Sequence, residues 1–561
     1  MPSGHPTALP PCVLHEDEHL LVVNKPAGWN THAPSPYAGE GIYDWLKHRE
    51  PRWASLAIIH RLDKETSGVL VFGKTPLANR SLTDQFAARA VRKKYHLLTD
   101  RPGPLSEQIV KTKLARAGDR YVSASHGELA ETRFKPSPAG DEVRSFKSIG
   151  TGENPEAQGK LARTHVGAYA MLEASPLTGR THQIRVHAAE SGFPILGDTG
   201  YGGTPFPRVC LHAAELAFQH PATGEAVLFR APTDFAADAR RALRHAILEP
   251  DVTNAFRLFH GASDGWPGGY VERLGNFILE QGELPLSPEQ RNLLAIATPS
   301  LGIYHKTLSR HLRRTSVAES SPRLVHGQAA PERFWIQENG VQFELSFNGG
   351  YSVGLFLDQR DNRRRLLSGH IAAGFPVNQP ERGPHSPELS VLNTFSYTCG
   401  FSVCAALAGA HTTSLDLSKK YLEWGRRNFA RNGLDPAQHD FIYGDTFDWL
   451  RRLAKKNRAF DVVILDPPTF SQSKATGVFR AEKDYGRLVG AALPVLKPGG
   501  VLLASTNAAE FPPESFLDQI NETVRSARRK IVQQHYVPQP PDFPISRAEP
   551  AYLKTVWVRI A

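Results

Sequence analysis

The sequence predicts three folds in succession, and a different pattern along the chain indicates each of them. Residues 1–240 contain short β-type runs separated by glycine and proline, which is typical of an α+β unit with a mixed, largely antiparallel sheet. Residues 256–331 are a shorter mixed segment and predict a small α+β unit. From about residue 334, apolar strands alternate with amphipathic helices, which predicts a doubly wound α/β sheet. We therefore expect domains at 1–245, 250–333 and 334–561.

The individual elements follow from this pattern in chain order. The first unit has apolar or β-branched runs at 20–25, 68–73, 93–98 and 169–176, and a polar stretch at 236–247 predicts a helix that closes it. In the last unit, strands are predicted at 389–396, 412–418, 440–445, 459–468 and 499–506, with helices between them. Two segments rich in glycine, proline and polar residues, 150–160 and 374–388, predict surface loops.

The composition is that of a soluble globular protein with a polyanionic partner. Of the 561 residues, 40% are hydrophobic and 22% charged, and the formal net charge of +10 favours nucleic acid, whose condensed counterions a basic surface releases. No apolar run approaches the ~20 residues of a membrane span, and the first residues do not form a secretory signal. The four cysteines show no zinc-ligand spacing. We expect a cytoplasmic protein that binds no metal and no membrane.

A candidate catalytic carboxylate stands in the segment 58–72, IIHRLDKETSGVLVF. A β-type run delivers Arg61 and Asp63 to a loop, and Gly68 leads into the next strand. A carboxylate among basic groups suits attack on a sugar that bears a base, or removal of a proton from it. A neighbouring arginine would keep the carboxylate ionised and oriented. The same tetrapeptide could also be an ordinary surface ion pair on a turn.

The first unit resembles the RluA-type pseudouridine synthase family over most of residues 10–235. The resemblance rests on motifs at 15–28, 60–68, 92–98, 177–187, 193–203 and 211–225, in the family's order. It implies that Asp63 is the catalytic carboxylate, that Tyr95 stacks on a flipped uracil, and that Arg185 pairs with Asp63. It also implies that Arg61 helps to displace the target base and that the reaction needs no cofactor. Without the resemblance, a strand tyrosine packed in the core is the alternative interpretation of Tyr95.

Polar residues follow four strands of the predicted α/β sheet. The first strand leads into Asn393, Phe395, Ser396 and Gly400, and the next three end at Asp416, Asp445 and Asp466. Carboxyl ends of parallel strands form the nucleotide site of such sheets, so these groups could bind a cofactor's ribose and adenine. Pro467 stiffens the loop after Asp466, and Phe470 could contact a flipped base. A dinucleotide-binding enzyme is the competing interpretation, but the first turn lacks its glycine pattern. Each aspartate alone could also be a helix cap.

Residues 255–561 resemble large-subunit rRNA methyltransferases of the RlmK and RlmI type. The motifs at 256–277 and 338–364 and the segment 466–474 carry this resemblance. It implies a Rossmann-like class I methyltransferase domain with S-adenosyl-L-methionine as cofactor, and it places around that cofactor Phe356, Asp358, Arg360 and Asn362. The family's Gly-x-Lys-Thr-Gly motif is here 350–354, GYSVG, so its lysine is missing.

The methylated atom can be argued from cysteine usage. Methylation at carbon-5 of cytosine uses a cysteine that adds to the ring, but neither 466–470 nor 505–511 contains one. Nitrogen-7 of guanine is nucleophilic enough to need only positioning, so it is the expected target. The expected partner is 23S rRNA or a large-subunit precursor, with tRNA as an alternative for the synthase. A ribosome assembly factor with only one active half is the other reading we keep.

Overall fold

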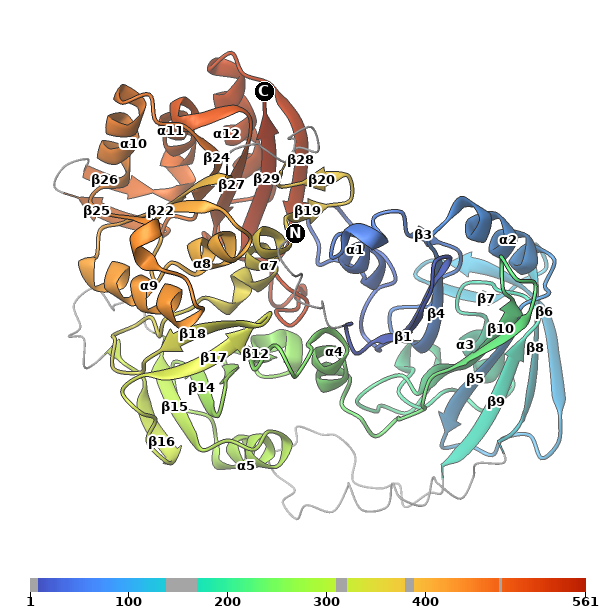
Figure 1. Ribbon diagram of the computed structural model, residues 1–561. Helices are drawn as coiled ribbons and strands as arrows, with labels where there is room; N and C mark the ends of the chain where they lie inside the picture. The colour runs from blue at the N-terminus through green and yellow to red at the C-terminus, as the bar shows by residue number, and fades with distance from the viewer. Residues whose placement is uncertain (1–8, 138–168, 309–319, 379–387, 474–476) are drawn as a thin grey trace. The chain divides into compact units, whose positions relative to one another are not determined.

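The computed structural model describes residues 9–137, 169–308, 320–378, 388–473 and 477–561, and the chain forms two compact units (Figure 1). The first unit comprises Met1–His32, Gly41–Tyr43 and Ser55–Leu248. The second comprises Ala33–Glu40, Asp44–Ala54 and Glu249–Ala561. The loop expected at 150–160, and most of the one expected at 374–388, lie outside the described residues. Within the described ranges, no helix has the length and apolarity needed to cross a membrane.

The first unit is built on an eleven-stranded sheet. Its main path runs β1-β2-β4-β10-β5-β9-β8-β6-β7, with β3 paired to β4 and β11 paired to β10. All neighbours are antiparallel except β4 and β10, so the expected mixed sheet is confirmed. The strands are β1 Val13–Glu16, β2 Leu20–Lys25, β3 Ala57–Ile58, β4 Ser67–Gly73, β5 Arg92–Thr99, β6 Gln108–Ala117, β7 Arg120–Ser123, β8 Glu128–Pro136, β9 Ala170–Pro176, β10 Leu211–Gln219 and β11 Ala226–Arg230.

Helices cover this sheet, and the central strand explains why they are needed. Every residue of β4 is buried, so both of its faces must be covered, and α2 supplies part of that cover through Ala78 and Leu82. Thr75 caps α2 and proline stands in its first turn, which explains why the helix begins there. The helices are α1 Ile42–Lys47, α2 Pro76–Ala87, α3 Gln183–Glu190 and α4 Ala239–Ile247.

The second unit begins with a five-stranded sheet in the order β12-β13-β14-β15-β16. Helix α5, Pro288–Ala297, starts with a complete capping box between Ser287 and Gln290. A β17-β18 hairpin follows and joins the same hydrophobic core as the sheet that comes next. The strands are β12 Ala255–His260, β13 Tyr270–Leu274, β14 Phe277–Gly282, β15 Gly302–Thr307, β16 Arg323–Gly327, β17 Phe334–Glu338 and β18 Val341–Leu345.

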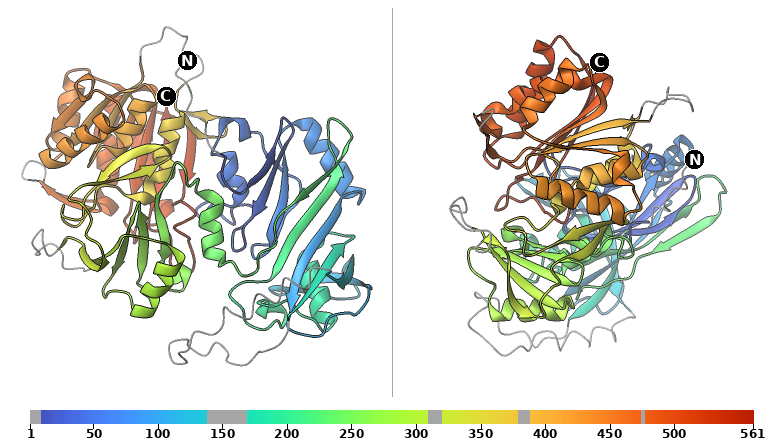
Figure 2. Two further views of the ribbon diagram at one scale, coloured as in Figure 1. Left: turned by 60° about the horizontal axis from the view of Figure 1, so that its bottom comes forward. Right: turned by 60° about the vertical axis from the view of Figure 1, so that its left-hand side comes forward.

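A seven-stranded sheet in the order β23-β22-β21-β24-β27-β29-β28 forms the rest of the second unit. The first five strands of this order are parallel and β29 is antiparallel to both its neighbours. Helices pack on both faces (Figure 2), so the predicted doubly wound α/β fold is confirmed. The strands are β21 Ser390–Thr394, β22 His411–Asp416, β23 Asp440–Tyr443, β24 Phe460–Leu465, β27 Leu496–Thr506, β28 Ile531–Val537 and β29 Lys554–Ile560; the helices are α7 Arg360–Ser368, α8 Gly400–Leu407, α9 Lys419–Arg431, α10 Thr446–Lys455, α11 Ala481–Ala492 and α12 Pro513–Ser526.

The direction of winding reverses between β21 and β24. β22 and β23 follow β21 on one side, whereas β24 and then β27 lie on the other. At such a switch point the loops that leave the strands diverge and open a crevice at the carboxyl ends. The polar residues predicted at the ends of β21, β22, β23 and β24 therefore lie along one edge of the sheet.

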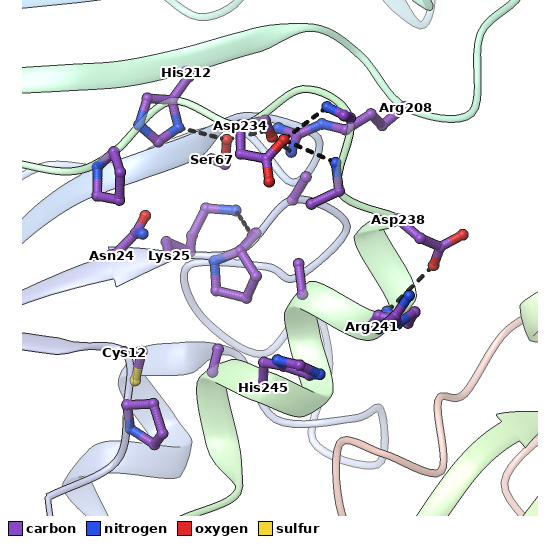
Figure 3. A pocket seen from close by; sticks show the side chains of 18 residues that line it. Cys12, Asn24, Lys25, Ser67, Arg208, His212, Asp234, Asp238, Arg241 and His245 are labelled. Atoms are coloured by element: carbon purple, nitrogen blue, oxygen red, sulfur yellow. Dashed lines mark hydrogen bonds between the residues drawn. The ribbon is translucent and has the colours of Figure 1, made fainter. Parts of the chain in front are cut away.

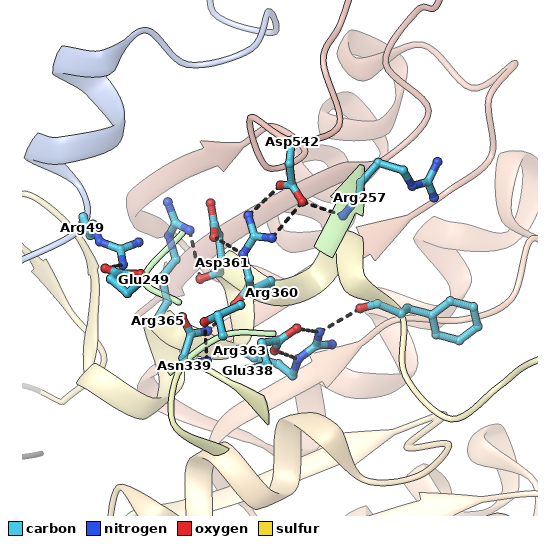
Figure 4. A network of polar contacts seen from close by, with 12 residues as sticks. Arg49, Glu249, Arg257, Glu338, Asn339, Arg360, Asp361, Arg363, Arg365 and Asp542 are labelled. Carbon is cyan, nitrogen blue, oxygen red and sulfur yellow. Dashed lines mark hydrogen bonds and ion pairs between the residues drawn. The ribbon is translucent and has the colours of Figure 1, made fainter. Parts of the chain in front are cut away.

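Buried ion pairs attach an early segment of the chain to the second unit. Arg364 of α7 forms an ion pair with Glu50 and also donates to the backbone carbonyl of Arg49, and both side chains of the pair are less than 10% exposed. Arg49 in turn bonds Glu249 at 2.6 Å (Figure 4). Burial and the neighbouring Arg49 lower the pKa of Arg364 to about 9. The arginine therefore depends on Glu50 to remain charged without large cost.

We expect Glu50→Ala to destabilise the second unit. Removing one partner of a buried pair leaves an uncompensated charge, which typically costs about 3–5 kcal/mol. Urea unfolding, followed by a probe in this unit, should show a lower midpoint. Glu423→Ala is the matched control, because Glu423 pairs with Arg426 at 3.1 Å but is 65% exposed, and a shift within about 0.5 kcal/mol is expected. Equal shifts for the two variants would contradict the role given to Glu50.

Candidate active sites

Asp63 lies in the loop between β3 and β4, where it is held on both sides. Thr31 accepts from the backbone N–H of Leu62 and donates to its carbonyl, at 3.2 and 2.8 Å. The backbone N–H of Thr66 donates to the carbonyl of Asp63 at 3.1 Å and closes the turn. The carboxylate itself is 28% exposed. The fold thus fixes the loop while leaving the Asp63 side chain accessible.

Lys25 supports the same loop from beneath. Its ammonium group is fully buried and donates to three backbone carbonyls, those of Pro26, Trp29 and Lys64, at 2.7–3.1 Å. Burial lowers the pKa of Lys25 to about 7, against the opposing charges of Glu65 and Asp63. Lys25 was not among the residues predicted from the sequence, although it lies in the 15–28 motif that carries the family resemblance.

A cavity of about 610 Å³ adjoins Lys25. Figure 3 shows Lys25 on its wall together with Ser67, Arg208 and His212. Arg208 donates to the Ser67 hydroxyl at 2.6 Å, and this hydroxyl also bonds His212 at 2.8 Å. Because Ser67 is the first residue of β4, this network fixes the strand that leaves the Asp63 loop.

Two basic side chains face Asp63, and one of them was predicted. Arg185 of α3 places a terminal nitrogen 3.7 Å from the Asp63 carboxylate, and His182 places Nε2 at 3.9 Å. Burial lowers the pKa of His182, and the charge of Asp63 opposes this shift. His182 itself adopts φ +56°, a left-handed conformation that is unusual for a residue other than glycine. The turn before α3 therefore brings a second basic side chain to the site.

The principal partner of Arg185 is a different carboxylate from the one expected. Arg185 donates to both oxygens of Asp198, at 2.6 and 2.8 Å, in a bidentate pair. Burial disfavours the charged guanidinium, but the hydrogen bonds and charge of Asp198 outweigh it and raise the pKa of Arg185. Asp198 thus fixes the arginine and leaves one terminal nitrogen directed to Asp63. Asp198 lies in the 193–203 motif, but spacing along the chain could not predict that it pairs with Arg185.

Tyr95 and Arg61 occupy different environments. Tyr95 lies on β5 between β10 and β9 and packs against the core of the unit. Burial and the nearby charge of Asp63 raise the pKa of the Tyr95 hydroxyl, so the ring stays neutral. Arg61 is exposed, and its guanidinium lies 3.5 Å from the ring nitrogen of His32. The structure therefore brings Asp63, Tyr95 and Arg185 together, with Arg61 on the surface beside them.

The turn after β21 is tightly constrained. Phe395, Tyr397 and Cys399 all have positive φ, between 49° and 64°, in a sequence without glycine before position 400. Asp416, at the end of β22, stabilises this turn by accepting from the backbone N–H of Tyr397 at 2.8 Å and from that of Ser418 at 2.8 Å. Burial raises the pKa of Asp416, and these backbone bonds oppose the shift. Such strain is characteristic of functional turns.

Asp466 ends β24 at the switch point. The amide of Gln359 lies 3.3 Å from both of its oxygens and donates to the Ser505 hydroxyl at 2.7 Å. Burial, and then the nearby charge of Asp358, raise the pKa of Asp466 to about 7. The hydroxyl of Tyr485 donates to the carbonyls of Leu465 and Ser505, both at 2.9 Å, and so joins the ends of β24 and β27. Asp466 is therefore a carboxyl group that titrates near neutrality.

Three residues expected around a cofactor are engaged inside the protein. Arg360 uses both terminal nitrogens on Asp542, at 2.9 and 2.6 Å (Figure 4). Asn362 bonds Gln359 and Trp557, at 2.7 and 3.0 Å. Asn393 is buried and donates to Ser402 of α8 at 2.9 Å. These side chains hold elements together, because burial has already assigned their hydrogen bonds.

The other predicted residues lie around the carboxyl ends of the strands. Phe356 is 49% exposed and stands 5.4 Å from the Tyr397 ring. Asp358 accepts from the Tyr552 hydroxyl at 2.9 Å, and burial raises its pKa. The remaining members are Ser396 in the turn, Gly400 at the first position of α8, Asp445 as the cap of α10, Pro467 after β24 and Phe470 in the short strand β25 Phe470–Ser473, which pairs with β26 Gly477–Arg480.

The cysteines are not placed for nucleophilic chemistry. All four are buried as free thiols, and burial raises the pKa of Cys210, Cys399 and Cys404 to about 12. A thiol with that pKa is almost wholly protonated at neutral pH and is a poor nucleophile. Within the ranges that the structure describes, no group of three histidine, cysteine or acidic residues could hold a metal ion.

Comparison with known proteins assigns both units. Residues 304–559 match the family described as S-adenosylmethionine-dependent methyltransferase, and residues 19–190 match RNA pseudouridylate synthase. The ribosomal RNA large subunit methyltransferase of Deinococcus radiodurans is 32% identical over 336 residues, 58% of this chain and 78% of that protein. Ribosomal RNA large subunit methyltransferase I of Aeromonas salmonicida is 31% identical over 325 residues, 56% of this chain and 77% of that protein. The chain belongs to this methyltransferase family.

The methyltransferase carries an RNA pseudouridylate synthase domain in its N-terminal unit. Among solved structures, human RNA pseudouridylate synthase domain containing 4 is 24% identical, with a TM-score of 0.29, over 41% of this chain and 92% of that chain. The two family matches and the methyltransferase relatives confirm the resemblance stated from the motifs for both halves. The chain is thus an enzyme with two catalytic domains, a pseudouridine synthase and a methyltransferase that uses S-adenosylmethionine.

The residues at the strand ends fit the methyl donor of this methyltransferase. Asp416 accepts from the backbone N–H groups of Tyr397, Leu417 and Ser418, and a carboxylate has about four acceptor sites, so it retains capacity for a ribose hydroxyl. The half-exposed Phe356 ring offers an apolar surface beside the strained turn. The set is acidic and aromatic, as a positively charged sulfonium nucleoside requires.

Proposed function

We propose that this chain modifies large-subunit rRNA twice, forming pseudouridine with its first unit and methylating nitrogen-7 of a guanine with its second. We assign pseudouridine formation to residues 1–245, RNA contact to 250–333 and methyl transfer to 334–561. The observation that carries the proposal is the pairing, in one chain, of an accessible Asp63 between two basic side chains and a near-neutral Asp466 at the sheet's switch point.

In the first unit, the N1–C1′ bond of uridine breaks and a C5–C1′ bond forms, so the reaction is an isomerisation without a co-reactant. Asp63 supplies the carboxylate that attacks the sugar or removes its proton, and Arg185 and His182 flank it at 3.7 and 3.9 Å. Tyr95 offers a neutral ring for stacking on the extruded uracil. Arg61, which is exposed, enters the space that the base leaves.

In the second unit, bound S-adenosylmethionine supplies an electrophilic methyl group. Asp416 and Asp445 would bind its ribose and adenine, and Phe356 would provide an apolar surface for the nucleoside. Asp466 accepts hydrogen bonds from the target base, and Phe470 stacks beside it. Gln359 orients the Asp466 carboxylate through its amide.

Guanine nitrogen-7 is favoured over cytosine carbon-5 as the acceptor. Nitrogen-7 has a free lone pair and loses no proton on methylation, so it needs only a positioned donor. Carbon-5 requires a thiolate that adds to the ring, whereas the cysteines here are buried and carry raised thiol pKa values. The residue between Ser505 and Asn507 is Thr506, which offers no such nucleophile.

The rRNA substrate is proposed from the relatives, whose names describe ribosomal RNA large subunit methyltransferases. A basic chain of net charge +10 supports a polyanionic substrate. Tethering the two active units raises the local concentration of the second once the first has bound. This favours one shared RNA, rather than tRNA for the synthase alone.

Mass-spectrometric mapping of rRNA and tRNA from cells with and without the gene tests the proposal. We expect one pseudouridine and one 7-methylguanosine to disappear from 23S rRNA together. Borohydride reduction followed by aniline cleaves RNA at 7-methylguanosine and reports the methylated atom independently. Loss of a 5-methylcytidine instead would overturn the assignment of nitrogen-7, and loss of pseudouridine from tRNA alone would overturn the shared substrate.

A further inference from the structure

A second cavity of the pseudouridine synthase domain lies beside the Asp63 site. It has a volume of about 360 Å³ and is formed by the ends of β6 and β7, the start of β8 and the loop before α3. Its polar lining comes from Arg116, Tyr121, His126, Glu128 and Arg180. Nothing in the reaction assigned above uses these residues.

Tyr121 connects this cavity to the catalytic carboxylate. The Tyr121 ring packs edge-on against the His182 ring, with centroids 5.6 Å apart, and His182 lies 3.9 Å from Asp63. The backbone N–H of Tyr121 donates to the Tyr201 hydroxyl, which also bonds His182 at 2.8 Å. Only one tyrosine and one imidazole therefore separate an occupant of the cavity from a uridine at Asp63. A ligand in the cavity and a uridine at Asp63 would therefore be as close as neighbouring nucleotides of one RNA strand.

The charges of the cavity favour an anion. Arg116, Arg180 and His126 provide up to three positive charges against the single carboxylate of Glu128. Arg180 forms an ion pair with Glu128, but their side chains are 39% and 68% exposed, so the pair contributes little and a phosphate can compete with it. Arg116 is exposed, and its Nε donates to the carbonyl of Gly118 at 3.0 Å, which leaves its terminal nitrogens for a ligand.

The loop that carries Arg180 is rigid, as a binding site requires. Gln183 accepts from the backbone N–H of Arg180 at 3.0 Å and donates to the carbonyl of Glu131 on β8 at 2.9 Å. The hydroxyl of Thr178 also donates to Gln183, at 2.7 Å. Gly127 also lines the cavity, and a Cβ at this position would lie 2.4 Å from the Leu114 backbone, so the glycine lets β6 and the turn before β8 approach closely.

We propose that this cavity binds the phosphodiester and sugar of the nucleotide next to the target uridine, with Arg116 and Arg180 on the phosphate. The inference rests on the pseudouridine synthase activity proposed above. The site would select the path of the RNA strand and contribute to affinity. It takes no part in bond breaking, so its loss should affect RNA binding rather than the rate on the bound complex.

The test uses the full chain and a short synthetic RNA that contains the uridine located by the mapping experiment. Arg116→Ala should weaken binding of this RNA about tenfold, as expected for one charge-assisted hydrogen bond, and should reduce the slope of log affinity against log salt by about one. The single-turnover rate at saturating RNA should be unchanged. Arg116→Lys should retain the salt slope. Arg230→Ala is the control, since Arg230 is another exposed arginine of the same unit that lies outside this cavity, and it should leave affinity unchanged.

Neutral methylphosphonate linkages at the two phosphates flanking the uridine locate the contact. One of them should weaken binding to the wild type about as much as Arg116→Ala does, and it should have no further effect on that variant. If the methylphosphonate and Arg116→Ala weaken binding additively, the proposal is wrong. It is also wrong if Arg116→Ala weakens binding no more than Arg230→Ala does. Binding is measured separately from turnover. A wild-type protein that shows the expected salt slope and methylphosphonate effect but forms no pseudouridine would refute only the proposed activity.

Discussion

Replacing Asp63 by asparagine is expected to abolish pseudouridine formation while leaving methylation intact. The amide keeps the size of the side chain but cannot act as a nucleophile or base, so a loss of at least about a thousandfold is expected. Because Asp63 is 28% exposed and its loop is held by Thr31 and Lys25, the domain should remain folded. The measurement is pseudouridine content after single turnover, with methyl incorporation recorded in the same sample.

Glu215→Gln is the control for loss of a carboxylate between two cations. Glu215 is 24% exposed and pairs with Lys94 at 3.2 Å and Arg230 at 3.0 Å, but it lies outside the Asp63 site. It should retain pseudouridine formation. If Asp63→Asn keeps even a tenth of the wild-type rate, Asp63 is not the reactive group. If it loses methylation as well, the two units do not act separately.

Asp466→Asn is expected to reduce methyl transfer about a hundredfold and to change its pH dependence. With the Asp466 pKa near 7, the carboxylate that accepts from the base forms only as pH rises through neutrality. The wild-type methylation rate should therefore rise between pH 6 and 8, and the residual rate of the variant should be flat over that range. A wild-type rate that is constant from pH 6 to 8 would contradict the role of Asp466.

The same substitution should stabilise the second unit at high pH. The native state holds the Asp466 proton more tightly than the unfolded chain, whose carboxyl pKa is 3.8, so ionisation costs folding free energy above pH 7. This penalty shrinks as pH falls through 7 and is gone below about 3.8. Asp466→Asn should therefore melt at a higher temperature than the wild type at pH 8, and the difference should decrease toward pH 5. A variant that melts lower at pH 8 would show that Asp466 stabilises the fold as a carboxylate.

Local pattern was sufficient for the fold classes and for the main acidic residues. Asp63 was recognisable because one continuous segment, 58–72, carries it. Asp416, Asp445 and Asp466 were recognisable because each follows an apolar strand, and parallel strands bring their carboxyl ends to one edge. The strands and the residues that follow them can be predicted because hydrophobic periodicity is a pattern of neighbouring residues.

The roles of the arginines depended on contacts between distant residues. Arg360 resembled a cofactor ligand by motif, yet it is bound by Asp542, 182 positions away. Arg185 lies 3.7 Å from Asp63, as expected, but its bidentate partner is Asp198, which spacing did not indicate. A guanidinium pairs with whichever carboxylate the fold brings within reach and shields from water, and spacing along the chain does not specify that.

The sequence by itself determined two sheet types, their order, and the positions of the candidate carboxylates in the 58–72 loop and after the strands of the α/β sheet. Only the tertiary structure decided which basic group serves which carboxylate, that residues 33–40 and 44–54 pack with the second unit, and that Asp466 titrates near pH 7. The physical reason is that strand and helix formation follow from neighbouring residues, whereas burial and the pairing of charges arise only when distant segments exclude water together.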